Sequence, residues 1–207
     1  MQDKINKLEK IKLFSKLDFS ITEKEIGNVI ISLKNGKSSG PDLIKNEMIK
    51  HGHHYLVKPL QKLFNLVLNS GYYPHEWSKG RIVSIHKKGD PTNPSNYRGV
   101  TISSVIGKLF NSILNKRLCD YLDANDIQAG FRKKHRSSDH MFILKNIMNK
   151  YKKEHKSLYI AFIDFKQAFD TIKHQELMYK LLKIGVSCKF YNIIKSKFEL
   201  EFTKVLL

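Results

Sequence analysis

The chain has 207 residues, of which 41% are hydrophobic, enough to bury a core and too many for an intrinsically disordered protein. It carries 37 lysine and arginine residues against 19 aspartate and glutamate residues, a formal net charge of +18. An excess of this size favours nucleic acid as a partner and, second, an anionic membrane surface. Only two cysteines are present, which excludes a disulfide framework and a zinc site of four cysteines.

The hydrophobic runs of the sequence argue against membrane insertion. No apolar run approaches the ~20 residues that a membrane span needs. The N-terminal residues are charged throughout and lack the apolar core of a signal peptide. We therefore expect no membrane partner and an intracellular protein, in the nucleus or the cytoplasm.

Helical spacing of apolar residues dominates the chain. Thr22 and Glu25 form a capping-box pattern that predicts a helix start, while Gly71 and Gly185 predict helix ends. Residues 1–17 show only a weak amphipathic pattern. In chain order, the expected helices cover residues 23–33, 43–50, 55–69, 105–122, 139–151, 174–184 and 188–198.

A loop rich in small residues follows the first strong helix. Residues 34–42 have the sequence KNGKSSGPD, in which glycine, serine and proline favour a loop. Two interpretations stay open: a flexible surface turn, or a loop whose two lysines contact phosphate. The spacing excludes a P-loop, because no second glycine is followed by Lys and then Ser or Thr.

Two further basic segments stand out. Residues 80–86 and 98–102 predict the strands of a hairpin with a long basic tip. Residues 128–136, QAGFRKKHR, predict a basic loop that is either a solvated face, an import signal or a nucleic-acid contact. Phe131 at the edge of this loop is compatible with stacking on a base or with an anchor in the core.

A short apolar run, LYIAFIDF at residues 158–165, predicts a strand covered on both faces. A carboxylate at the end of such a strand is costly unless it is paired or holds a metal, so Asp164 is either a turn cap or a metal ligand. Phosphoryl transfer on a polynucleotide needs cations, which Lys87 and Arg98 can supply, and metal-binding carboxylates, of which Asp164 is one. Asp170 is expected to cap the next helix. From the residues alone, the site is therefore incomplete.

Several segments, in order, resemble the blocks of reverse transcriptases in the form found in non-LTR (LINE-type) retrotransposons. The first catalytic motif of that family is similar to YIAFIDFKQAFDTIKHQEL. Its opening block resembles KNGKSSGPDLIKNEMIK, and its next two blocks, which form the fingers, resemble WSKGRIVSIHKKGDPTNPSNYRGVTISSVIGKLFNSILNKRL. The fourth block resembles QAGFRKKHRSSDHMFIL. The resemblance extends from about Ile21 to Ile184, and five blocks in series argue against a chance match.

The resemblance implies roles for individual residues. Asp164 matches the catalytic, metal-binding aspartate of the polymerase palm. Phe169 matches the position beneath the sugar of the incoming nucleotide, where a bulky ring selects deoxynucleotides. Lys87 and Arg98 match finger residues that contact the incoming triphosphate.

The resemblance also implies partners and a cofactor. Gly130, Phe131, Arg132 and Lys133 match a nucleic-acid-binding loop near the template strand. The complete family enzyme uses Mg²⁺, an RNA template, a DNA primer and deoxynucleoside triphosphates.

The fold implied by the resemblance is α+β. A helix-rich fingers subdomain with a β-hairpin is followed by the start of a right-hand polymerase palm. This divides the chain into a helical extension or linker at residues 1–20, a fingers-like region at residues 21–156 and a partial palm at residues 157–207.

The catalytic aspartate pair of the family has no counterpart, because the sequence contains no Asp-Asp. We therefore expect a chain that is incomplete at its C-terminus, lacks the rest of the palm and the thumb, and has no polymerase activity alone. One alternative is a non-catalytic, basic nucleic-acid-binding module. The other is a non-functional relic of a mobile element, in which the apolar residues 159–165 lack sheet partners and stay uncovered.

Overall fold

The computed structural model describes residues 2–9, 16–122, 128–131, 135–165, 168–169, 171–186, 188–200 and 202–205. These residues form two compact units. Unit 1 comprises Met1–Tyr121 and Lys173–Leu207, and unit 2 comprises Leu122–Ile172.

Unit 1 holds most of the regular secondary structure. Its helices and strands are α1 (Gln2–Glu9), α2 (Glu23–Ile31), α3 (Asn46–His51), α4 (His53–Ser70), α5 (His75–Ser78), β1 (Lys79–His86), β2 (Tyr97–Ser103), α6 (Val105–Tyr121), α8 (His174–Lys183), α9 (Cys188–Leu200) and β3 (Phe202–Val205), with short 3₁₀ helices at Lys16–Asp18 and Pro94–Asn96. Helix α2 packs on α4 and α6, α4 packs on α9, and α8 packs on α9 and α1.

The helix ends follow the local sequence signals. Thr22 Oγ1 accepts a hydrogen bond from the backbone N–H of Glu25 (3.2 Å), and Glu25 Oε2 accepts one from the N–H of Thr22 (2.9 Å), so the predicted capping box of α2 is confirmed. Gly71 after α4 has φ 68° and Gly185 after α8 has φ 87°. Because this left-handed backbone favours glycine, both predicted helix ends are confirmed.

One helix starts later than its pattern predicts. The helix expected at residues 43–50 is α3, which begins at Asn46. Asp42 Oδ1 accepts a hydrogen bond from the N–H of Ile44 (3.2 Å), and this local bond holds the preceding residues in a turn.

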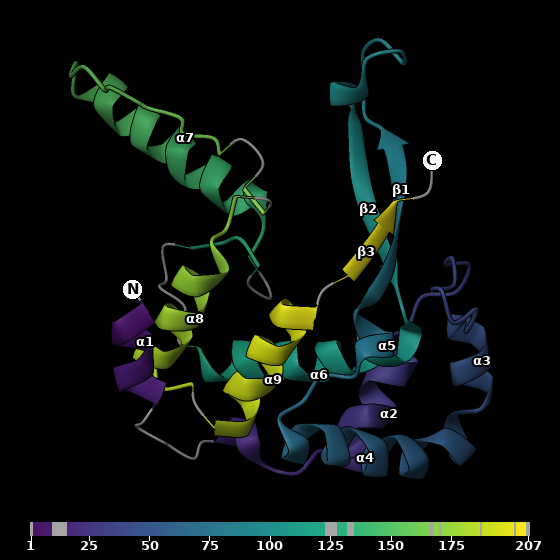
Figure 1. Cartoon of the computed structure of the whole chain (residues 1–207). Coiled ribbons are helices and arrows are strands. Elements are labelled where there is room, and N and C mark those ends of the chain that lie inside the picture. The colour runs from purple at the N-terminus through teal and green to yellow at the C-terminus, as the bar shows by residue number, and fades with distance from the viewer. Residues whose placement is uncertain are drawn as a thin grey trace. The chain divides into compact units, whose positions relative to one another are not determined.

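The predicted hairpin is confirmed. Strands β1 and β2 pair antiparallel, from Gly80 opposite Ser103 to His86 opposite Tyr97. The backbone of β3 pairs parallel with the start of β1, which gives the strand order β2–β1–β3. Figure 1 shows the hairpin projecting away from the helices of unit 1, with β3 beside β1. No sequence pattern predicts β3, but helices with this small sheet confirm the α+β class.

An aromatic cluster anchors the base of the hairpin. Phe64 of α4, Tyr73 and Phe110 of α6 are each 0% exposed. The ring centroid of Phe110 lies 5.3 Å from that of Phe64, 5.6 Å from that of Trp77 and 6.3 Å from that of Tyr73. Trp77 belongs to α5, which ends one residue before β1 begins. The cluster therefore ties the first residues of β1 to the core of unit 1.

Side chains also fix the segment before α2 against distant helices. Asn65 of α4 accepts a hydrogen bond from the N–H of Ile21 (2.6 Å) and donates one to the carbonyl of Ile21 (2.9 Å). Asp18, 2% exposed, accepts a hydrogen bond from the N–H of Phe190 in the first turn of α9 (3.0 Å). Asp18 thus satisfies one of the N–H groups that a helix start leaves without an intrahelical partner.

Unit 2 contains one long helix, α7 (Ser137–Lys153), and an irregular segment after it. The strand predicted at residues 158–165 is wrong, because these residues have no regular secondary structure. A strand needs partner strands, and the described residues of unit 2 include none. Tyr159 is 93% and Phe162 84% exposed, so the expectation that this apolar stretch stays uncovered is confirmed.

Candidate functional site

Lys87 and Arg98 lie near each other at the tip end of the hairpin, on its two opposite arms. The register places Arg98 opposite Ile85, and the N–H of Lys87 donates to the carbonyl of Asn96 (2.8 Å). Lys87 therefore follows the last residue of β1 and lies across the hairpin from Asn96, two positions before Arg98. Both cationic side chains are exposed. The two residues for which the resemblance implies a triphosphate contact are thus both exposed near the tip end of the hairpin.

The loop at the tip of the hairpin is held by its own side chains. Asp90 Oδ1 accepts hydrogen bonds from the N–H (2.8 Å) and the hydroxyl (2.7 Å) of Thr92. These two bonds hold the pKa of Asp90 below its ordinary value. The hydroxyl of Tyr97 donates to the carbonyl of Pro91 (2.9 Å). These hydrogen bonds within the tip loop therefore hold the backbone that carries its basic residues in one conformation.

In unit 2, the structure brings two predicted site residues into contact. The rings of Phe131 and Phe169 meet edge to face, with centroids 6.2 Å apart and an interplanar angle of 86°. Phe131 has φ 62° and is 89% exposed, and Phe169 is 66% exposed. Gly130 precedes Phe131 in a turn, with open space around its Cβ position. The predictions for Arg132, Lys133 and Asp170 concern residues outside those that the structure describes.

Asp164, the predicted metal ligand, belongs to no group of metal-binding side chains among the described residues. Asp164 is exposed and follows the irregular apolar segment. Mg²⁺ is held by several oxygen ligands. Within the part of the chain that the structure describes, no three histidine, cysteine, aspartate or glutamate side chains come together in a metal-binding group.

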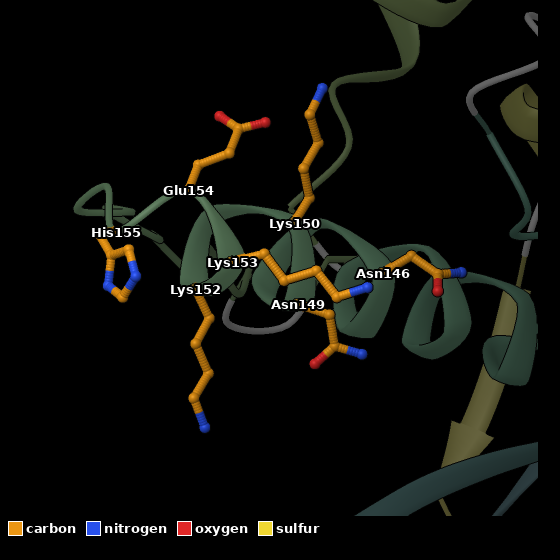
Figure 2. A pocket seen from close by; sticks show the side chains of 7 residues that line it. All are labelled: Asn146, Asn149, Lys150, Lys152, Lys153, Glu154 and His155. Atoms are coloured by element: carbon orange, nitrogen blue, oxygen red, sulfur yellow. The ribbon is translucent and has the colours of Figure 1, made fainter.

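A shallow hollow of about 700 Å³ runs along the C-terminal turns of α7. It is lined by Asn146, Asn149, Lys150, Lys152, Lys153, Glu154 and His155. Figure 2 shows Lys150 and Lys152 pointing in opposite directions, and Glu154 and His155 pointing away from the lysine at position 153. Because these side chains diverge, they form a basic surface rather than a site with converging groups.

Comparison of the sequence with known proteins assigns the chain to a family. The model of the family described as reverse transcriptase (RNA-dependent DNA polymerase) matches residues 85–206, which is more than half of the chain. The chain belongs to the reverse transcriptase family. The matched region begins in β1 and takes in the hairpin tip, α7, Asp164 and Phe169.

Curated relatives of this reverse transcriptase chain come from mobile elements. It is 30% identical over 185 residues to the RNA-directed DNA polymerase from mobile element jockey of Drosophila melanogaster, covering 87% of this chain and 20% of the relative. It is 29% identical over 182 residues to the probable RNA-directed DNA polymerase from transposon X-element (84% and 20%) and 31% identical over 186 residues to that from transposon BS (86% and 20%), both of the same organism. The predicted kinship with non-LTR retrotransposon reverse transcriptases is confirmed.

The reverse transcriptase chain spans about a fifth of the length of these relatives. Among its described residues, no helix has both the length and the hydrophobicity needed to cross a bilayer.

Proposed function

We propose that this chain supplies the fingers-like region, residues 21–156, and the first palm motif, within residues 157–207, of an RNA-directed DNA polymerase. The complete protein would carry out metal-dependent nucleotidyl transfer, with an RNA template, a DNA primer and deoxynucleoside triphosphates as substrates. The match of the family model to residues 85–206 carries this proposal. The exposed positions of Lys87 and Arg98 on the two arms of the hairpin near its tip support it, because a triphosphate needs cations close together.

The proposed role of Lys87 and Arg98 is to bind and orient the triphosphate. An exposed lysine is a point charge, whereas the arginine fork can donate two parallel hydrogen bonds to phosphate oxygens. The ordered tip loop keeps the backbone of both residues in place before the ligand arrives, which reduces the entropy lost on binding.

The proposed roles of the unit 2 residues follow the resemblance. Phe169 would lie beneath the sugar, and the loop with Gly130, Phe131, Arg132 and Lys133 would contact the template. The edge-to-face contact of Phe131 with Phe169 supports a common site for these two rings.

Mg²⁺ belongs to the proposal for the complete protein, where it would stabilise charge on the transferred phosphates. Asp164 is the residue of this chain that would hold it. Since Asp164 has no neighbouring group of ligands among the described residues, we propose that the 207-residue chain binds its substrates without joining nucleotides.

The proposed triphosphate contact is tested by a charge-neutralising pair of substitutions. Lys87→Gln with Arg98→Gln is expected to weaken binding of a fluorescent deoxynucleoside triphosphate by about ten-fold or more, because each lost contact involves a charged group. The measurement is an equilibrium fluorescence titration of the 207-residue chain. Both side chains are exposed, so folding should be unaffected.

Lys24→Gln with Lys58→Gln is the matched control, since it removes the same charge from exposed positions of α2 and α4. It is expected to bind the triphosphate as the unsubstituted chain does. Equal binding by the Lys87/Arg98 variant and the control would contradict the assigned contact.

A second candidate function is a non-catalytic nucleic-acid-binding module. The net charge of +18 and the diverging lysines of α7 favour it, because a surface of this kind attracts phosphate backbones without reading sequence. Such a module would bind polynucleotides but would show no dependence of triphosphate affinity on Lys87 and Arg98.

A further inference from the structure

The loop between α2 and α3 contains Asn35, the one asparagine of the sequence that is followed by glycine. Asn35 and Gly36 are both exposed, in a bend of the chain. Asparagine is chemically labile in proteins, because the backbone nitrogen of the next residue can attack its side-chain amide. Gly36 has no Cβ to hinder such an attack, and with φ 69° it has open space around the Cβ position.

Helix α3 fixes the chain just before this dipeptide. The side chain of Asn46, 5% exposed, donates to the carbonyl of Lys34 (2.7 Å). Lys50 Nζ donates to the carbonyl of Leu33 (3.2 Å). The start of the loop is therefore a positioned segment and not the flexible surface turn that its composition allows.

Lys50 also contacts the side-chain amide of Asn35. Its Nζ donates a hydrogen bond to Oδ1 of Asn35 (3.0 Å). A cation at this oxygen draws electrons away from Cγ, and it stabilises the negative charge that the oxygen gains when a nucleophile adds to Cγ. Lys50 therefore activates the amide of Asn35 towards attack.

Glu47 contacts the backbone nitrogen of Gly36. Its Oε1 accepts a hydrogen bond from this N–H (2.5 Å). The same bond holds the pKa of Glu47 below its ordinary value, so the side chain is an ionised carboxylate at neutral pH. A carboxylate within hydrogen-bonding distance of a proton can remove that proton as the nitrogen attacks. Glu47 is thus in position to act as a general base.

The two side chains of α3 assist the two partners of one bond. Glu47 and Lys50 lie three positions apart on the helix, which places both side chains towards the loop. A base on the attacking nitrogen and a cation on the oxygen of the attacked carbonyl are the two aids that acyl transfer to a nitrogen requires. Both are held by a helix, so they are in place before the reaction begins.

We propose that Asn35 and Gly36 react with each other to form a succinimide, which water then opens. The backbone nitrogen of Gly36 forms a bond with Cγ of Asn35 while its proton passes to Glu47. Glu47 returns this proton to Nδ2 of Asn35 as the bond between Cγ and Nδ2 breaks, and ammonia leaves. Lys50 stabilises the charge on Oδ1 between the two steps. No nucleotide or nucleic acid takes part.

Water opens the ring at one of its two carbonyl carbons, because the dipeptide is exposed. Addition at Cγ breaks the bond from Cγ to the nitrogen of Gly36 and leaves aspartate at position 35. Addition at the backbone carbonyl carbon breaks its bond to the same nitrogen and leaves isoaspartate, in which the main chain runs through Cβ and Cγ. Either product carries a new carboxylate beside Lys50. Isoaspartate also lengthens the main chain by one carbon, which displaces the N–H of Gly36 from Glu47.

The first test compares reaction rates of variants at neutral pH. The rate is the gain in mass of the peptide that contains residues 35 and 36, followed by mass spectrometry. Glu47→Gln and Lys50→Gln are each expected to slow the reaction by about ten-fold or more, because one removes the base and the other the cation. Glu76→Gln and Lys58→Gln are the matched controls, since they make the same changes at exposed positions of α5 and α4. Both controls should react as the unsubstituted chain does.

Urea provides a comparison for each variant. In denaturing urea α3 no longer holds Glu47 and Lys50 against the dipeptide, so all variants should react at one rate. Equal rates for Glu47→Gln, Lys50→Gln and the unsubstituted chain without urea would overturn the proposal.

The products of the unsubstituted chain give a second test, which does not depend on how any variant folds. Because a succinimide opens at either carbonyl, isoaspartate and aspartate should both accumulate at position 35. Isoaspartate is detected in the digested chain by a protein isoaspartyl methyltransferase with radiolabelled S-adenosylmethionine. The folded chain should form it faster than the same chain in urea at equal pH and temperature. Aspartate as the sole product, or a faster reaction in urea, would contradict the assisted reaction.

Discussion

Replacing Phe110 by alanine is expected to lower the free energy of unfolding by about 4 kcal/mol. The ring is 0% exposed and contacts the rings of Phe64, Tyr73 and Trp77. Its loss removes buried apolar area and leaves a cavity that the surrounding rings cannot fill, because they are fixed by one another. A change of this size is a large fraction of the stability of a typical domain.

The measurement is urea-induced unfolding followed by circular dichroism, with the midpoint and slope compared at equal protein concentration. Phe142→Ala is the matched control, because it makes the same chemical change at a ring that is 67% exposed on α7. The control is expected to change stability by no more than about 0.5 kcal/mol. Similar losses in both variants would contradict the assignment of Phe110 to the centre of the core.

Replacing Arg117 by alanine is the second change with a large expected effect, a loss of about 3 kcal/mol. The guanidinium of Arg117 donates to both carboxylate oxygens of Glu25, from Nε at 2.7 Å and from Nη2 at 2.9 Å. It also donates to the carbonyls of Leu17 (3.1 Å), Phe19 (2.5 Å) and Ser20 (3.1 Å). With only 12% of the side chain exposed, its removal leaves these acceptors in a poorly hydrated place.

Lysine at position 117 keeps the charge but cannot reproduce the fork, so Arg117→Lys should lie between alanine and the unsubstituted chain. Lys116→Ala, at the exposed neighbouring position, is the control and should be close to neutral. The same unfolding measurement applies. If Arg117→Lys is as stable as the unsubstituted chain, the bonds to the three carbonyls contribute little.

The Glu25–Arg117 pair also makes the stability of the folded chain depend on pH. Burial alone raises the pKa of Glu25, but hydrogen bonds from Arg117 and from the N–H of Thr22 outweigh it, so the pKa lies below the ordinary value of 4.5. A carboxyl group whose pKa is lowered by folding stabilises the folded state at pH values above its ordinary pKa. This stabilisation is lost as the pH falls through the pKa of the folded state. Arg117→Ala should therefore flatten the fall in stability below about pH 4.5.

Local signals in the sequence predict local structure well. The capping box of Thr22 and Glu25, the glycine ends of α4 and α8, and the two strands of the hairpin all depend on residues close together in the chain. The register of that hairpin then places Arg98 opposite Ile85 without further information.

Features that depend on distant partners could not be predicted in the same way. The apolar residues 158–165 have the composition of a buried strand, but a strand needs neighbouring strands, and composition does not supply them. The contact of Phe131 with Phe169 and the bonds of Arg117 to Glu25 likewise join segments that no periodicity connects.

The surroundings of Arg81 at the base of the hairpin show an intermediate case. Arg81, Val83 and Ile85 alternate with their neighbours along β1, and this even spacing alone places the three residues on the same face. The approach of Lys37 to Arg81 needs Gly40 against Ser103, a contact between a loop and a strand end that the sequence does not reveal.

The central claim is that this member of the reverse transcriptase family presents basic surfaces that bind a polynucleotide. Its most direct test is the affinity of the 207-residue chain for a single-stranded RNA oligonucleotide between about 50 and 200 mM salt. We expect log affinity to fall linearly with log salt, with a slope of about −0.7 for each phosphate contacted, because binding releases counterions. An affinity that does not change with salt, or the absence of binding at the lowest salt concentration, would contradict the claim.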